Sequence, residues 1–174
     1  MVDFSKIKDI ELNNVKQILD EYALKFQDLV KHNITEKDSK GYNHVATGNL
    51  LASIHTSIDF GAEKYTVYLH SKDYLKFLEE GTKPHWPPAK PILEWVRNKK
   101  LPTKENTGDK SLPTEKQLTF LISRKISKDG TNAYPVVANT MEELNAIYTE
   151  KLKEALEEDI KKWLPIIHIQ LHFK

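Results

Sequence analysis

The sequence predicts an α+β fold, in which a small antiparallel sheet packs against a long N-terminal helix, short middle helices and a long C-terminal helix. Two observations predict it. Apolar residues recur at steps of three and four over 7–30 and over 141–163, which is the period of an α-helix. Over 54–70 the period changes to two, which is typical of strands. With 174 residues, the chain is long enough to bury a core as a single domain, 1–174.

The first third of the chain should contain one long helix, one loop and one short helix. The apolar stripe of 7–30 has charged residues on its other faces, as an amphipathic helix requires. The pattern is lost after His32, so 33–46 is expected to be an exposed loop. Thr47 can then cap a short helix over 47–54, because its hydroxyl can accept a hydrogen bond from a free backbone N–H.

A β-hairpin is expected next. Ile54, Ile58 and Phe60 share one face of a first strand, and Tyr65 and Leu69 share one face of a second. Residues 61–64 supply the turn between the two strands. The hairpin over about 54–70 should therefore have one buried face.

A short helix should follow the hairpin, with Ser71 as its cap and Gly81 just after its end. Glu79 and Glu80 occupy its last turn, where the helix dipole disfavours negative charge. Two interpretations are open. Either the two carboxylates carry a small penalty at an exposed helix end, or a cation from elsewhere, such as a neighbouring subunit, pairs with them.

The remaining chain predicts three further helices and a terminal strand. A proline-rich segment, 84–88, is followed by a helix over 92–100 and an exposed loop over 99–113. Thr114 and Gln117 form a capping box for a helix that stops at Gly130. The last helix begins at a second capping box, from Thr140 to Glu143, or earlier at Pro135, and Pro165 ends it. The alternating tail 166–173 is expected to be a strand or arm that completes its own sheet or joins a neighbour's.

Composition excludes several classes of site. The chain has 0 Cys, so disulfides, thiolate metal sites and cysteine nucleophiles are excluded. The formal net charge is +1, and no apolar run reaches the roughly 20 residues that span a bilayer. The N-terminus lacks a signal-peptide pattern, so we expect a chain that is made and used in a cytoplasm. The stretch 90–128 carries ten basic and four acidic residues, a local +6 that suits a solvated loop or a surface facing DNA or an acidic neighbour.

Residues suited to catalysis are sparse. His70, Glu80 and His85 could converge only if the chain folded back on itself, and nothing in their spacing demands it. His168 and His172 would stand about 13 Å apart on a strand, too far to share a metal ion. The chain carries no glycine-rich phosphate loop, nucleophile elbow or zinc-helix motif. We therefore expect no enzyme, no catalytic residues, no cofactor and no metal.

Seven short segments stand out together by their order along the chain: 47–54 (TGNLLASI), 65–68 (YTVY), 74–82 (YLKFLEEGT), 84–88 (PHWPP), 91–96 (PILEWV), 120–126 (FLISRKI) and 129–135 (DGTNAYP). This ordered set resembles the neck or tail-completion proteins of tailed bacteriophages, a family of head–tail joining, minor structural proteins. The resemblance covers about 47–141, more than half of the chain. The chain departs from the family pattern at Val136 and Val137, where the family usually has an aromatic residue, and in the tail 166–173, which has no counterpart.

The resemblance implies a structural virion protein without catalytic activity, assembled in the host bacterial cytoplasm. It would form part of the head–tail connector, a ring of identical subunits around the DNA channel that also contacts other neck, portal-adaptor or tail proteins. It implies no membrane association. The residues expected at subunit contacts are Tyr74, Phe77, Glu79, Glu80, His85 and Trp86, and those expected to face the DNA or the lumen are Lys99, Lys100, Lys104 and Lys110.

Two alternatives belong to other classes. A nucleic-acid-binding accessory protein would use the basic stretch 90–128, with Trp86 and Trp95 available to stack on bases. A small hydrolase would use Glu80 and His85. The structural role is favoured over the first because both tryptophans are better explained as core or interface anchors, and over the second because the chain lacks a catalytic constellation.

Overall fold

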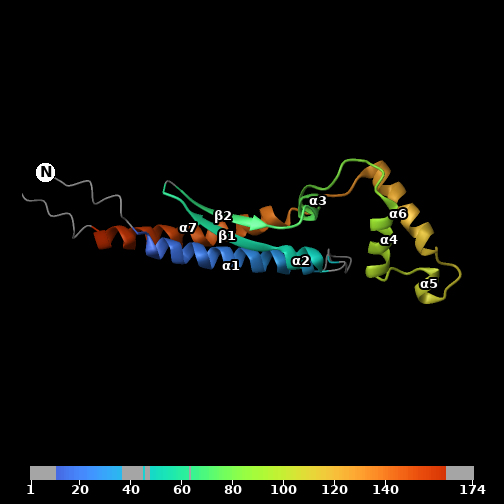
Figure 1. Cartoon of the computed structure of the whole chain (residues 1–174), viewed down its shortest axis with the longest axis horizontal. Helices are drawn as coiled ribbons and strands as arrows, with labels where there is room; N and C mark the ends of the chain where they lie inside the picture. Colours follow the sequence, from blue (N-terminus) through green and yellow to red (C-terminus); the bar gives the residue numbers. More distant parts are fainter. Residues whose placement is uncertain (1–10, 37–44, 46–47, 63, 164–174) are drawn as a thin grey trace, which may run out of the picture. The chain divides into compact units, whose positions relative to one another are not determined.

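The computed structural model describes residues 11–36, 45, 48–62 and 64–163 (Figure 1). In this part of the chain, seven helices accompany a two-stranded antiparallel sheet, which confirms the predicted α+β class. In chain order the elements are α1 (Asn13–Thr35), α2 (Asn49–Ser53), β1 (His55–Phe60), β2 (Tyr65–His70), α3 (Tyr74–Glu80), α4 (Ala89–Asn98), α5 (Lys104–Thr107), α6 (Glu115–Asp129) and α7 (Val136–Trp163).

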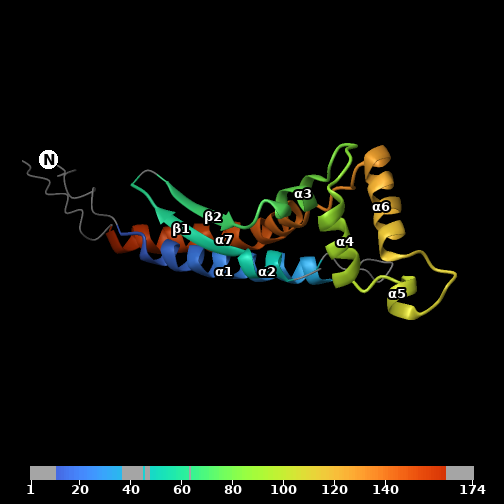
Figure 2. The same ribbon diagram turned by 45° about the vertical axis from the view of Figure 1, so that its right-hand side comes forward.

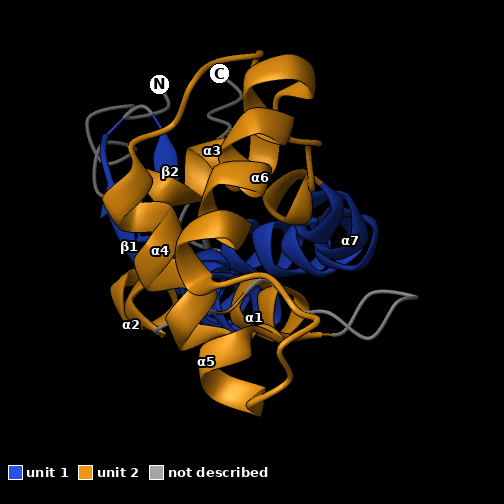
Figure 3. Cartoon of the chain, turned by 90° about the vertical axis from the view of Figure 1, so that its right-hand side faces the viewer, with its two compact units in different colours: residues 1–29, 56–69, 139–174 blue, residues 30–55, 70–138 orange. Residues whose placement is uncertain are grey.

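The chain forms two compact units, each built from segments far apart in the sequence (Figure 3). The first unit contains Met1–Leu29, Thr56–Leu69 and Asn139–Lys174, and the second contains Val30–His55 and His70–Ala138. Neither unit is one continuous stretch of chain. The expected single domain, 1–174, stays a prediction.

In the first unit, α1 and α7 lie side by side and the hairpin covers α1 (Figures 1 and 2). The Tyr22 and Tyr148 rings meet edge to face, with their centroids 5.3 Å apart. The Thr56 hydroxyl of β1 donates to the Ala23 carbonyl of α1 at 3.2 Å. Burial of apolar surface between these elements is the main favourable term for the unit. Its buried apolar side chains are Ala23, Phe26, Leu144, Tyr148 and Ala155.

A carboxylate from α7 caps the start of α1. Asp159 is 1% exposed, and its two oxygens accept hydrogen bonds from the backbone N–H groups of Asn14 and Val15, at 3.2 and 3.0 Å. The residue before α1 is Leu12, whose side chain has no acceptor. Asp159 therefore supplies, from a distant element, the acceptor that a local N-cap residue usually provides.

The second unit joins the ends of α3 and α6 through a short antiparallel bridge. Thr82 and Thr131 exchange two backbone hydrogen bonds of 3.1 Å, and their hydroxyls lie 3.0 Å apart. Gly81 and Gly130, the preceding residues, have φ angles of 68° and 71°, so the predicted glycine stops of both helices are confirmed. In the same unit α4 packs against α6 (Figure 2). The buried side chains of α6 include Thr119 and Ser123, which are small and allow two helices to approach closely.

The local predictions for α6 and the hairpin are confirmed. The Thr114 hydroxyl accepts from the Gln117 N–H at 3.2 Å, and the Gln117 side chain accepts from the Thr114 N–H at 2.8 Å, which completes the capping box. The strands His55–Phe60 and Tyr65–His70 agree with the predicted hairpin over 54–70 within one residue. Exposed and half-buried residues alternate along them as predicted, except at Phe60, which is exposed, and Thr66, which is half-buried. The last helix begins at Val136, so the earlier of its two expected starts is right and Thr140 lies buried inside the helix.

Several predicted boundaries are wrong. The loop expected over 33–46 begins too early, because α1 continues to Thr35 and Ile34 is fully buried. The loop expected over 99–113 contains α5, and Thr103, which precedes that helix, is fully buried. Asp73 rather than Ser71 holds the N-cap position of α3. The proposed cap Thr47 and the tail strand 166–173 lie outside the described residues.

Candidate interaction surfaces

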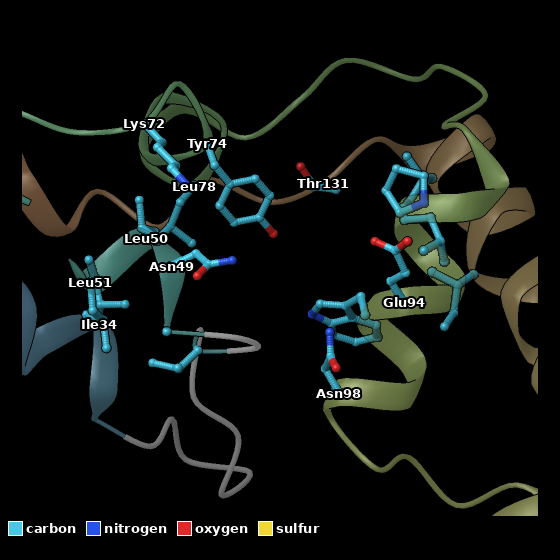
Figure 4. A pocket seen from close by; sticks show the side chains of 17 residues that line it. Ile34, Asn49, Leu50, Leu51, Lys72, Tyr74, Leu78, Glu94, Asn98 and Thr131 are labelled. Carbon is cyan, nitrogen blue, oxygen red and sulfur yellow. The ribbon is translucent and has the colours of Figure 1, made fainter. Parts of the chain in front are cut away.

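A groove of about 650 Å³ opens in the second unit (Figure 4). One wall comes from the end of α1, α2 and α3, and the other from α4 and α6. In Figure 4, Glu94 and Asn98 of α4 face across the groove toward Asn49 and Leu50 of α2. Such an apolar groove with a few polar groups suits an apolar side chain or chain segment. Its apolar lining includes Ile34, Leu50, Leu51, Leu78, Ile92, Trp95, Ile122 and Ile126.

Local sequence patterns position this lining. In α4, Ile92 and Trp95 are three residues apart and therefore lie on the same face of the helix. Ile122 and Ile126 of α6 are four apart and share a face for the same reason. The helical period thus explains why these side chains share a face, but it does not indicate that the faces border a groove.

An aromatic cluster is exposed on the same unit. Trp86, in the proline-rich segment, lies against Phe120 of α6, with ring centroids 5.8 Å apart. The side chains remain 56% and 54% exposed, and the adjacent Leu121 is 51% exposed. Large apolar side chains that gather on a surface in this way mark interaction sites more often than singly exposed ones do.

Of the six residues expected at subunit contacts, five are exposed and one, Glu79, is paired within its own chain. Tyr74 and Phe77 of α3 are 56% and 53% exposed, and Tyr74 also lines the groove. Glu80 and His85 are exposed as well. Glu79 is different, since its carboxylate lies within hydrogen-bond distance of backbone groups in its own chain.

Glu79 caps the start of α7. Its two carboxylate oxygens accept from the N–H groups of Val137 and Ala138, both at 2.8 Å. Because Pro135 precedes the helix and has no side-chain acceptor, α7 lacks a local cap. Neither interpretation drawn from the sequence is right for Glu79: its partner is the positive end of another helix in the same chain, rather than solvent or a cation.

The residues considered for catalysis stay apart. His70 stacks on His55, and the Nδ1 atom of His85 lies 2.9 Å from the Lys83 carbonyl oxygen. Among the described residues, no group of three or more His, Cys, Asp or Glu side chains is arranged to hold a metal ion. The structure therefore shows no metal site shared by His70, Glu80 and His85 in this part of the chain.

Three of the four lysines expected to face DNA are exposed. Lys100, Lys104 and Lys110 lie around α5 with exposed side chains. Lys99 is half-buried, and burial lowers its pKa below the ordinary value because it disfavours the charged form. In the same basic stretch, Arg97 pairs with Glu115 at 2.7 Å and is not left for a ligand.

No helix in the described residues is long and apolar enough to cross a membrane. Comparison of the chain with protein-family models, curated proteins and solved structures found no match.

Proposed function

We propose that the chain is a structural virion protein of a tailed phage, which forms part of the head–tail connector as a ring of identical subunits around the DNA channel. The ordered segments between 47 and 135 support this role through their resemblance to neck and tail-completion proteins. The role needs no catalytic site. It requires surfaces that other subunits cover.

The observation that carries the proposal is the exposed aromatic cluster of Trp86 and Phe120, together with the exposed Leu121 that follows Phe120 in the sequence. Each of these side chains leaves about half of its surface in water, although burying a large apolar side chain contributes roughly 1.5–3 kcal/mol. A neighbouring subunit that covered the cluster would gain this term. Aromatic side chains are also enriched among the residues that dominate binding energy at interfaces.

The proposal is tested by measuring the mass of the full-length protein, alone and mixed with virion partners, and by imaging the same samples with negative stain. We expect closed rings whose formation is weakened by the double substitution Trp86→Ser and Phe120→Ser. Leu24→Ser is the matched control, because Leu24 is 62% exposed but belongs to the first unit, whereas the cluster belongs to the second. A chain that stays monomeric with its partners, and is missing from purified particles, would rule out the connector role.

A nucleic-acid-binding accessory protein is the second candidate, favoured by the exposed Lys100, Lys104 and Lys110. Measuring DNA binding of the same protein preparation at several salt concentrations tests this candidate, because binding through phosphate contacts weakens steeply with salt. Salt-dependent DNA binding by a monomer, abolished by Lys→Glu changes at these three positions, would favour this candidate. Absence of DNA binding at low salt would remove it.

A further inference from the structure

Two histidines face each other where the hairpin strands meet α2 and α3. His55 is the first residue of β1 and His70 is the last residue of β2. Their rings are stacked, with centroids 4.8 Å apart and an interplanar angle of 17°. Both side chains are exposed. Two imidazoles are therefore held together in a position that solvent and ions can reach.

A backbone carbonyl fixes the tautomer of His55. Its Nδ1 atom lies 3.0 Å from the Ser53 carbonyl oxygen. A carbonyl oxygen only accepts hydrogen bonds, so Nδ1 must carry the proton and Nε2 keeps its lone pair. Histidines that bind metals usually donate their other ring N–H to such an acceptor, which orients the ring and raises its basicity.

The residue that orients His55 is itself held in place. The Ser53 hydroxyl donates to the Leu50 carbonyl at 2.7 Å and accepts from the Lys72 N–H at 3.1 Å. Lys72 follows His70 by two residues, so Ser53 links the start of β1 to the end of β2. This link keeps the two histidines at the same level of the hairpin.

We propose that His55 and His70 form a two-histidine chelate for a late first-row divalent metal ion such as Cu²⁺, Ni²⁺ or Zn²⁺. Imidazole suits these ions, and Cu²⁺ binds most tightly in the general affinity order. Bonds of about 2.0–2.1 Å to both rings require the two nitrogens to be roughly 3 Å apart, so the stacked rings would have to tilt toward the ion on binding. With two protein ligands the site keeps open positions for water or a third group. The inference does not depend on the proposed assembly role.

The site is tested by titrating the full-length, chelator-treated protein with CuCl₂ and with NiCl₂. Calorimetry measures the affinity for each metal, and electron paramagnetic resonance reports the ligands of copper. The variants are His55→Gln, His70→Gln and the double variant. His85→Gln is the matched control, because His85 is exposed and its Nδ1 lies 2.9 Å from a carbonyl oxygen, yet no other described imidazole stacks on it. Binding that remains in the double variant measures any weak sites elsewhere.

We expect each single variant to lose at least about tenfold in affinity, since even the loss of an outer partner of a ligand costs about 10–100-fold. His85→Gln should bind like the unaltered protein, and the copper spectrum should show two nitrogen ligands only while both His55 and His70 are present. If His55→Gln misfolds by circular dichroism, His70→Gln decides. Unchanged affinity in the double variant, or an equal loss in His85→Gln, would overturn the proposal.

Discussion

At the scale of single residues, two adjacent glutamates at the end of α3 have different roles. Glu79 accepts two backbone hydrogen bonds at the start of α7, whereas Glu80 is exposed. On a helix, neighbouring residues point about 100° apart, so only one of them can face α7. The α7 N-terminus and its free N–H groups favour a carboxylate at that point.

Glu79→Gln should destabilise the fold by about 1–2 kcal/mol, since it removes a charge from the helix N-terminus and one of two acceptors. Urea unfolding monitored by circular dichroism measures the change. Glu80→Gln is the matched control and should stay within about 0.5 kcal/mol of the unaltered protein. Equal effects of the two changes would contradict the capping role of Glu79.

At the scale of elements, two glycines allow the ends of α3 and α6 to meet. A Cβ atom at Gly130 would lie 2.0 Å from the Thr82 carbonyl oxygen, and one at Gly81 would lie 2.4 Å from the Thr131 carbonyl oxygen. Both obstacles are backbone atoms, which cannot turn aside as a flexible side chain can. The bridge between Thr82 and Thr131 therefore requires glycine at both positions.

Gly130→Ala should cost roughly 3 kcal/mol or more, because it adds a backbone clash to the strain of a positive φ. Gly108→Ala is the control: its φ is 77°, but no atom lies within 4 Å of the added Cβ. The control should cost about 1 kcal/mol from backbone strain alone. Thermal and urea unfolding of both variants measure the difference, and similar losses would mean that the bridge tolerates a side chain.

The element scale also shows why both long helices start where they do. Asp159 caps the first turn of α1, and Glu79 caps the first turn of α7. Neither helix has a capping side chain of its own in the residue just before it. By contrast, α6 carries its capping box in its own sequence. Of these three helices, α6 alone has a start that a local motif locates to the residue.

At the scale of the molecule, stability should depend on alkaline pH through the contact between α1 and α7. The Tyr148 hydroxyl donates to Glu21 at 2.8 Å, and burial together with this hydrogen bond raises the pKa of Tyr148 to about 12. The Lys151 ammonium also bonds Glu21, at 2.9 Å. This bond, followed by the one from Tyr148, lowers the pKa of Glu21.

The pKa of Tyr148 is about 10 in the unfolded chain and about 12 in the folded one. Its hydroxyl therefore contributes its full stabilisation below pH 10, and this contribution decreases as the pH rises toward 12. The free energy of unfolding should therefore fall between pH 10 and 12, and less steeply in Tyr148→Phe. Urea unfolding across this range measures both slopes. Tyr68→Phe, at an exposed tyrosine of β2, is the control for the loss of a phenol elsewhere in the same unit. A slope unaffected by Tyr148→Phe would show that other groups control the alkaline transition.

The division of the chain into two units affects how its stability must be measured. Tyr148, Glu21 and Lys151 belong to the first unit, while Glu79 and Gly130 belong to the second. If the units unfold in separate steps, one free energy of unfolding does not describe the chain. Probes in each unit, such as hydrogen exchange at α1 and at α6, would assign each substitution to its own transition.

The sequence by itself determined the features that depend on neighbours along the chain. The periods of three to four and of two identified the helices and the hairpin, and Thr114, Gln117, Gly81 and Gly130 marked helix ends that the structure confirms. Counting residues outward from the predicted turn could also have shown that His55 and His70 lie opposite each other on the two strands. These signals act within a few residues or across one short turn, where local geometry alone fixes the partners.

Only the tertiary structure decided which distant groups meet. Glu79 and Val137 are 58 positions apart, and Val15 and Asp159 are 144 apart. A helix N-terminus accepts any carboxylate that packing brings within reach, so the sequence shows the need for a cap but not its source. The groove in the second unit has the same origin, because its walls come from segments as distant as Ile34 and Ile126. Tertiary packing therefore determines the partners of groups whose contacts cannot be inferred from neighbouring residues in the sequence.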